Sequence, residues 1–171
     1  MRGRVVVGTN GSLGSLRALH EAAAHARARE AELLVVMAWQ PPGGGPGSRT
    51  ACGPSVLTDH RNATAALLRE ILDAFREGRP GVAPVGRIVR NTPGVALVDA
   101  VGDPGDLLVV GTGSRGPLLR ALRPSVARYC MAHAPCPVLA VPPSPLQADL
   151  EALDRRNAWR IPRDGRTAAA G

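Results

Sequence analysis

The chain has 171 residues with 44% hydrophobic content, enough to bury one core, and this length is typical of a single domain. Its formal charge is +7, but the 21 basic residues are scattered and opposed by 14 acidic ones, which disfavours a dedicated nucleic-acid surface. There is no run of about 18 apolar residues, which excludes a membrane-spanning helix. The 3 cysteines, an odd number, and the lack of an apolar leader lead us to expect a reduced, cytoplasmic protein.

The first part of the chain predicts a strand, a helix and a second strand. Arg4 to Gly8 is a short apolar run typical of a buried strand, and Gly11 with Ser12 supplies a turn and a helix start. Apolar residues then recur at helical spacing and predict the buried face of a helix: Leu16, Leu19, Ala23 and Ala26. Leu33 to Trp39 is a continuous apolar run and predicts the second strand.

A loop and a long helix are expected next. Gln40 to Pro54 contains the run PPGGGPGS, and glycine with proline disfavours regular structure. Thr58 or Asp59 is expected to cap a helix that ends at Gly78. The predicted buried face of this helix consists of Ala63, Ala66, Leu67, Ile71 and Phe75.

The second half of the chain continues the alternation of strands and helices. Val82 to Val89 predicts a third strand and Thr92 to Val101 a short helix. Leu107 to Val110 predicts a fourth strand, roughly Val126 to Ala134 the last helix, and Val138 to Val141 the final strand. This order predicts an α/β fold with a parallel sheet and right-handed crossovers.

Glycines gather in the loop after the fourth predicted strand. Gly111, Gly113 and Gly116 let the backbone turn sharply and bring its N–H groups close to an anion, and Ser125 is placed to cap the following helix. The first N–H groups of a helix are unpaired, and its dipole is positive there. The layout predicts a phosphate-binding loop, in which Arg115 would hold phosphate oxygens in bidentate fashion.

The composition changes after the final predicted strand. The prolines of the run PPSP restrict the backbone where the chain leaves the final strand. The segment RIPRDGRTAAAG has no periodic apolar residues that could join a core. We therefore assign one domain to residues 1–142 and a partly disordered tail to residues 143–171.

Two segments of the sequence carry a resemblance to a known family. One is VVVGTNG with Ser12 and the helix and strand that follow, and the other is DLLVVGTGSRGPLLRALRPSVARYCMAHAPCPVLAV, from Asp106 to Val141. Together they cover most of residues 1–142 and resemble universal stress proteins of the UspA type. The resemblance implies a Rossmann-like, adenine nucleotide alpha hydrolase-like sheet of five parallel strands in the order 3-2-1-4-5, flanked by helices. It also implies a small stress-response or regulatory module and no enzyme.

ATP-binding members of that family carry Gly, two residues, Gly, nine residues, and then Gly with Ser or Thr. Aligning this chain on Ser125 places Gly111 on the first glycine, Ser114 on the second and Pro124 on the third, while Asn10 stands where the family usually has Asp. Proline has no N–H, and losing one charge-assisted hydrogen bond costs about 1.5–3 kcal/mol, or roughly ten- to a hundredfold in affinity. The resemblance therefore implies ATP or a related adenine nucleotide, weakened by Ser114 and Pro124.

The ligand is expected at the carboxyl ends of the first and fourth strands, where ligands sit in open parallel sheets. The nucleotide-binding hypothesis, which joins the resemblance to the loop residues, places Thr9, Asn10 and Ala38 near the nucleoside. It has the nucleotide held by Gly111, Gly113, Ser114, Arg115, Gly116, Ser125 and Val126.

Other chemistries have weaker support in the sequence. Cys130, His133 and Cys136 are spaced three apart, but a structural zinc site needs four ligands, so buried apolar cysteines and no metal site are expected. A hydrolase is disfavoured because Thr112 breaks the G-x-S-x-G pattern around Ser114. Two hypotheses stay open: a nucleotide-binding module, and a nucleotide-independent protein-interaction module of the same fold.

The last predicted strand suggests how the protein assembles. Val138, Leu139, Ala140 and Val141 would form an apolar strand at the edge of the sheet, and exposed edges tend to pair. We therefore expect a homodimer through this strand, which the resemblance also implies. No membrane partner is expected, and other protein partners are unknown.

Overall fold

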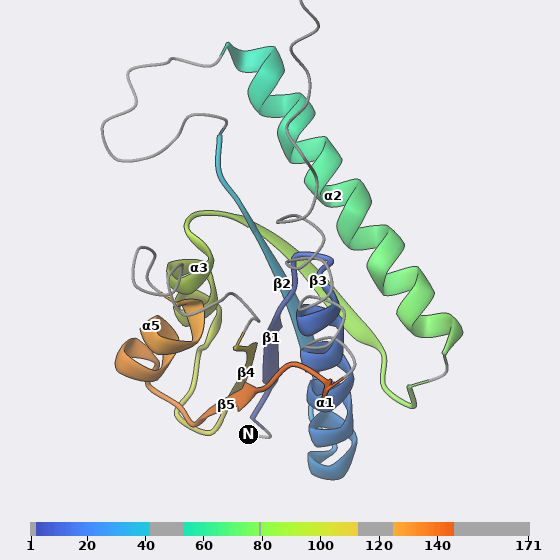
Figure 1. Ribbon diagram of the computed structural model, residues 1–171, viewed down its shortest axis with the longest axis vertical. Coiled ribbons are helices and arrows are strands. Elements are labelled where there is room, and N and C mark those ends of the chain that lie inside the picture. Colours follow the sequence, from blue (N-terminus) through green and yellow to red (C-terminus); the bar gives the residue numbers. More distant parts are fainter. Residues whose placement is uncertain (1–2, 42–52, 79, 113–124, 146–171) are drawn as a thin grey trace, which may run out of the picture.

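The structure, a computed structural model, describes residues 3–41, 53–78, 80–112 and 125–145. Strands and helices alternate along the chain (Figure 1). They are β1 (Val5–Gly8), α1 (Leu13–Arg29), β2 (Leu33–Trp39), α2 (Pro54–Glu77), β3 (Pro84–Arg90), α3 (Pro93–Ala100), β4 (Leu107–Gly111), α5 (Val126–His133) and β5 (Val138–Val141). Within these ranges, no helix combines the length and apolarity needed to cross a membrane.

The strands form one parallel sheet in the order β3-β2-β1-β4-β5, which confirms the predicted fold class and strand order. The register sets Val5 of β1 opposite Leu33 of β2 and Leu107 of β4. Val5, Val6 and Val7 are all 0% exposed, because β1 lies at the centre of the sheet and is covered on both faces.

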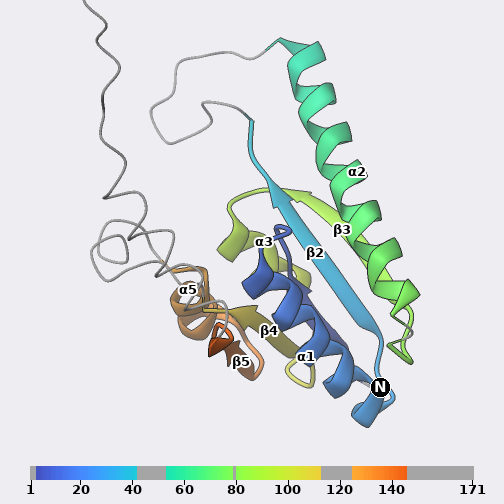
Figure 2. The same ribbon diagram turned by 45° about the vertical axis from the view of Figure 1, so that its right-hand side comes forward.

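Helices cover both faces of this sheet, with α1 and α2 on one side and α3 and α5 on the other (Figure 2). Successive residues of β1 therefore belong to different apolar clusters. Val5 and Val7 pack with Leu19 of α1 and Leu72 of α2, whereas Val6 packs with the residues of α3 and α5. The continuous apolar runs of the sequence are explained by this burial on two faces.

Helix α2 begins earlier than the sequence predicts. Pro54 is its first residue and Gly53 its N-cap, so the expected cap at Thr58 or Asp59 was wrong. Proline suits a first helical turn because the N–H that it lacks would be unpaired there. The Thr58 hydroxyl instead donates to the carbonyl oxygen of Pro54, at 3.0 Å.

The predicted buried face of α2 was right at Ile71 and Phe75 and wrong at Ala63 and Leu67, which are exposed. Leu67 is 41% exposed, whereas Leu68 is 5% exposed. The run of apolar residues in mid-helix allows either face, and the partner strand decides between them. Gly86 of β3 has no side chain, and a Cβ built there would lie 2.6 Å from Leu72 Cδ1 and 3.2 Å from Leu68 Cδ2. The space left by this glycine is what Leu68 and Leu72 occupy.

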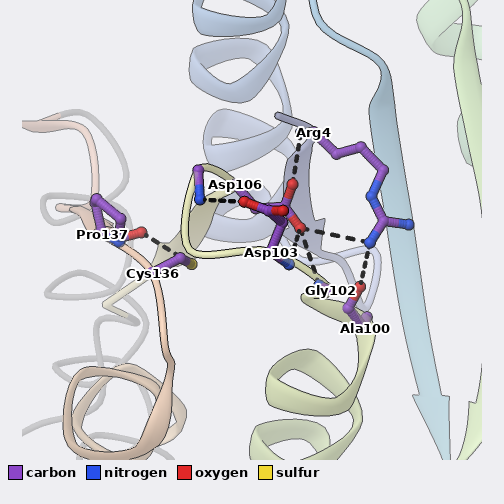
Figure 3. A network of polar contacts seen from close by, with 8 residues as sticks. Arg4, Ala100, Gly102, Asp103, Asp106, Cys136 and Pro137 are labelled. Carbon is purple, nitrogen blue, oxygen red and sulfur yellow. Dashed lines mark hydrogen bonds and ion pairs between the residues drawn. The ribbon is translucent and has the colours of Figure 1, made fainter. Parts of the chain in front are cut away.

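A buried carboxylate ties β1 to β4 at their amino ends (Figure 3). Asp106, 2% exposed, accepts the N–H of Arg4 at 2.7 Å, of Gly102 at 2.9 Å and of Asp103 at 3.2 Å. Its Oδ2 also lies 3.4 Å from Nη2 of Arg4. Burial alone would raise the pKa of Asp106, but the three N–H groups and the Arg4 charge outweigh it and hold that pKa below its ordinary value. We call these four residues the Asp106 clamp.

Candidate functional site

The carboxyl ends of β1, β2 and β4 meet where the order of the strands reverses direction. In open parallel sheets this switch point is where ligands bind. The register pairs Gly8 with Val36, and the N–H of Thr9 donates to the carbonyl oxygen of Val36 at 2.9 Å. Thr9 and Asn10 therefore leave β1 at the sheet edge where β2, with Ala38, and β4, with Gly111, also end. The fold thus brings these four predicted site residues to one edge of the sheet.

The loop between β1 and α1 is closed by its own side chains. Asn10 Oδ1 accepts the N–H of Ser12 at 3.1 Å, and Ser12 Oγ accepts the N–H of Ser15 at 3.3 Å, which caps α1. The N–H of Asn10 donates to Ser15 Oγ at 3.3 Å, and that of Gly11 to Thr9 Oγ1 at 3.4 Å. Gly11 has a φ of 79°, a backbone region that favours glycine.

The Ser15 hydroxyl lies at the centre of this network. It donates its single proton to the carbonyl oxygen of Ser12 at 2.8 Å, since a carbonyl can only accept. Thr9 Oγ1, at 3.2 Å from Ser15 Oγ, must therefore donate its own proton to Ser15. Ser15 was missing from the predicted site residues. Its position three residues after Ser12, the spacing of a helix cap and its N3 partner, is the signal that could have found it.

Gly111 has a packing role that does not depend on a ligand. A Cβ built on Gly111 would lie 3.0 Å from the carbonyl oxygen of Gly14 and 3.3 Å from its carbon. The first turn of α1 therefore packs directly on the end of β4. The glycine at position 111 lets this helix approach the strand.

Of the residues predicted to bind the phosphates, those after Thr112 and before Ser125 lie outside the described part of the chain. Ser125 is the N-cap of α5 and Val126 its first residue, as predicted, but the Ser125 side chain makes no capping hydrogen bond, so that part of the prediction was wrong. The first N–H groups of α5 therefore have no side-chain cap from Ser125. The remaining predicted positions lie outside the described residues: Gly113, Ser114, Arg115, Gly116 and also Pro124.

A cluster around Trp39 was not found from the sequence. The Arg90 guanidinium lies 5.6 Å from the centre of the Trp39 ring, and the His60 ring lies 6.0 Å from it. Trp39 is only 8% exposed, while Arg90 and His60 are exposed. The three side chains come from β2, β3 and α2, so no local pattern could have joined them. The cluster puts a cationic guanidinium at the same sheet edge as Ala38.

Cys130 and Cys136 are buried, as the sequence predicts. Both are free thiols in the apolar cluster that includes α3 and α5. Burial raises the pKa of Cys130 to about 11 and raises that of Cys136 as well, which disfavours the thiolate that a metal would need. Across the described ranges, no three His, Cys, Asp or Glu side chains gather as they would around a metal ion. Cys52 lies outside those ranges.

The last strand, β5, lies at one end of the sheet beside β4. Val138, Leu139 and Ala140 are half-buried and Val141 is buried. The N–H and the hydroxyl of Thr112 both donate to the carbonyl oxygen of Val141, at 2.9 and 3.4 Å. This end of β5 is thereby anchored to the start of the loop after β4.

The sheet order defines a doubly wound α/β domain, with the polar β1–α1 loop at its switch point. The model of the universal stress protein family matches residues 1–142. The chain therefore belongs to the universal stress protein family, which confirms the resemblance seen in the sequence.

Solved structures of the same family resemble this one. A universal stress protein crystallised in complex with cAMP is 31% identical, with a TM-score of 0.62 over 83% of this chain and 98% of that one. A member from Burkholderia pseudomallei is 25% identical, with a TM-score of 0.56 over 84% and 97%. A member from Archaeoglobus fulgidus in complex with dAMP is 21% identical, with a TM-score of 0.52 over 82% and 99%, and shows the fold alone. No protein of curated function matches the chain.

Proposed function

We propose that this chain is a nucleotide-binding universal stress protein that holds an adenine nucleotide at the switch point between β1 and β4, and that it acts by binding and not by catalysis. The observation that carries the proposal is the gathering of Thr9, Asn10, Ala38 and Gly111 at that edge. The likeness to a cAMP complex at 31% identity supports the choice of ligand class.

A nucleotide with one phosphate group fits the chain better than ATP does. The start of α5 offers N–H groups that Ser125 does not cap, and such groups suit an anion. The sequence, however, has Pro124 just before this helix, and proline removes one donor from the loop. Fewer donors penalise a triphosphate most, since it has the most charge to satisfy. We therefore place AMP and cAMP above ATP.

The test is a calorimetric titration of the purified full chain with cAMP, AMP and ATP, with cGMP as the control for the base. We expect an adenine nucleotide with one phosphate to bind at micromolar affinity and ATP to bind at least about tenfold more weakly. Changing Ser114→Gly and Pro124→Gly together should then strengthen ATP binding by roughly one to two powers of ten per recovered bond. No binding of any adenine nucleotide at millimolar concentration would refute the proposal.

A nucleotide-independent interaction module of the same fold is the second candidate. It is favoured by the packing of Gly111 against Gly14, and by the internal hydrogen bonds of the β1–α1 loop. Both observations give the motif residues a structural reason to be there without a ligand. Mass spectrometry of the denatured protein separates the candidates, since only a nucleotide-binding module should release an adenine nucleotide that co-purified with it.

We also propose that the protein forms a symmetric homodimer through antiparallel pairing of β5. Support comes from the position of β5 at the end of the sheet and from its apolar sequence, VLAV. The cytoplasmic location expected from the sequence stays a prediction.

A further inference from the structure

An exposed apolar patch lies near the start of α1, on the side of this helix that faces α2. The rings of His20 on α1 and Phe75 on α2 lie 5.2 Å apart, which fixes how the two helices are aligned. Both helices follow strands of a parallel sheet and therefore run in the same direction. About two turns before the ring contact, α1 reaches Leu13 and α2 reaches Leu67, and these leucines are 60% and 41% exposed.

A second contact brings the two leucines to the same place. A Cβ built on Gly11, two residues before Leu13, would lie 3.9 Å from Leu67 Cδ1. Ala63, one turn before Leu67 on α2, is also exposed. The apolar spacing of α2 predicts that Ala63 and Leu67 are buried, yet no described element covers them. We call Leu13, Ala63 and Leu67 the seam patch.

The chain leaves the family domain close to this patch. Val141, the last residue of β5, pairs with Gly111 of β4, and Gly111 packs against Gly14 in the first turn of α1. The end of β5 is thus one strand away from the start of α1. Residues 142–145 can span up to about 13 Å in extended form. The match to the universal stress protein family ends at residue 142, so it gives the following segment no role.

The sequence of that segment favours an amphipathic helix. Ser144 and Gln147 have the spacing of a capping box, and Pro145 between them suits a first helical position. Pro145, at the end of the described chain, is already helical. Apolar residues then recur at helical spacing and would form one face: Leu146, Leu150 and Leu153. A short helix of this kind is marginal alone in water and needs a surface for its apolar face.

The charge of the segment also suits a contact within the chain. Its acidic residues are Asp149, Glu151 and Asp154, and no basic residue precedes Arg155, whereas the whole chain has a net charge of +7. Arg17 follows Leu13 by one turn of α1 and borders the seam patch. Opposite charges near an apolar contact favour one orientation of the docked segment.

We propose that residues 146–156 dock as an amphipathic helix on the seam patch of the same chain. The leucines of the segment cover Leu13 and Leu67, and the segment then lies beside the β1–α1 loop. Attachment through only four residues gives the segment a high effective concentration at the patch, which favours docking within one chain over docking between chains. The proposal does not depend on the binding of a nucleotide.

The experiment measures amide hydrogen exchange of the full-length protein by mass spectrometry, in peptides that cover residues 146–156. These amides should exchange at least about tenfold more slowly than in a synthetic peptide of the same sequence. The protection should be equal at two protein concentrations that differ by about twentyfold, because docking within one chain does not depend on concentration.

The variants Leu13→Gln and Leu67→Gln test the patch. Glutamine keeps a good helix propensity but removes apolar surface, so each variant should speed the exchange of residues 146–156 by roughly three- to tenfold. Met131→Gln is the matched control, because Met131 is 58% exposed but lies on α5, which covers the other face of the sheet. It should leave the exchange of the segment unchanged. Slow exchange of the β1 amides serves as the folding check in every variant.

Three outcomes would overturn the proposal. The first is exchange of residues 146–156 in wild type at the rate of the synthetic peptide. The second is protection that both Leu13→Gln and Leu67→Gln leave intact, which would place the docking surface elsewhere. The third is protection that appears only at the higher concentration, which would assign the patch to a second copy of the chain. Each outcome is read without a nucleotide, so the test is separate from that of the proposed function.

Discussion

Replacing Asp106 with Asn should reveal how much the clamp between β1 and β4 stabilises the fold. The two carboxylate oxygens of Asp106 accept three backbone N–H groups and lie beside the Arg4 guanidinium. Asparagine has one acceptor oxygen, so its NH₂ group must face at least one N–H that has no other partner. A hydrogen bond to a charged group contributes about 1.5–3 kcal/mol, and the bonds that remain become weaker when the charge is lost. We expect a loss of about 2–4 kcal/mol, which for a domain of this size lowers Tm by roughly 5–15 °C at pH 7.

The pH dependence follows from the lowered pKa of Asp106. Its contribution is fully present above the ordinary aspartate pKa of 3.8 and is lost as the pH falls through the lower value of the folded state. The Tm difference between wild type and Asp106→Asn should therefore be constant from pH 7 to pH 5 and shrink in more acidic buffer. Thermal melts followed by circular dichroism across this range measure both effects.

The matched control is Asp73→Asn. Asp73 pairs with Arg76 at 2.9 Å, but its side chain is 69% exposed, and such surface pairs contribute little. Its Tm should stay within about 1 °C of wild type. Equal melting of wild type and Asp106→Asn at pH 7, or a difference that does not depend on pH in acid, would refute the reasoning about the clamp.

Three further measurements test other parts of the structure. Gly111→Ala should lower stability by about 1–3 kcal/mol in urea unfolding, because the new Cβ meets a backbone oxygen of α1 at 3.0 Å. Gly53→Ala, whose Cβ would meet nothing nearer than 4.0 Å, should cost less than about 1 kcal/mol, the cost of a poorer N-cap on α2. Cys130 and Cys136 should react with a thiol reagent far more slowly in the native protein than in denaturant, because burial raises the pKa of both thiols. Fast reaction of all 3 thiols in the native protein would contradict this prediction. Val138→Asp should give folded monomers in light scattering, and a wild-type protein that is monomeric at tens of micromolar, where about 6 kcal/mol of association suffices for dimers, would argue against pairing through β5.

The arrangement of the sheet could be predicted because strands that are buried on both faces appear in the sequence as continuous apolar runs. Val5 to Val7 and Leu107 to Val110 are continuous apolar runs, and the strands that contain them are buried on both faces. Helix boundaries and faces were harder. The buried face of α2 depends on the space above Gly86, a residue nine positions beyond the end of the helix, so the local pattern could not choose between Leu67 and Leu68.

Only part of the candidate site could be predicted from the sequence, because some of its contacts depend on side-chain orientation and on segments far apart in the chain. Thr9, Asn10 and Gly111 could be found because they directly follow or end apolar runs, and topology then brings them together. The bonds among Thr9, Ser12 and Ser15 depend on side-chain orientation within a turn, which residue types alone do not fix. The cluster of Trp39, His60 and Arg90 joins three elements, and only the folded chain places them side by side.

The Asp106 clamp and the candidate site lie at opposite ends of the same two strands, β1 and β4. Groups that share no partner and lie more than about 10 Å apart usually contribute independently to stability. Selection can therefore alter the ligand chemistry of one edge, as with Asn or Asp at position 10, without weakening the other edge that fastens the strands. A fold built in this way tolerates exchange of its ligand, which suits a scaffold from which new binding specificities arise while foldability is kept.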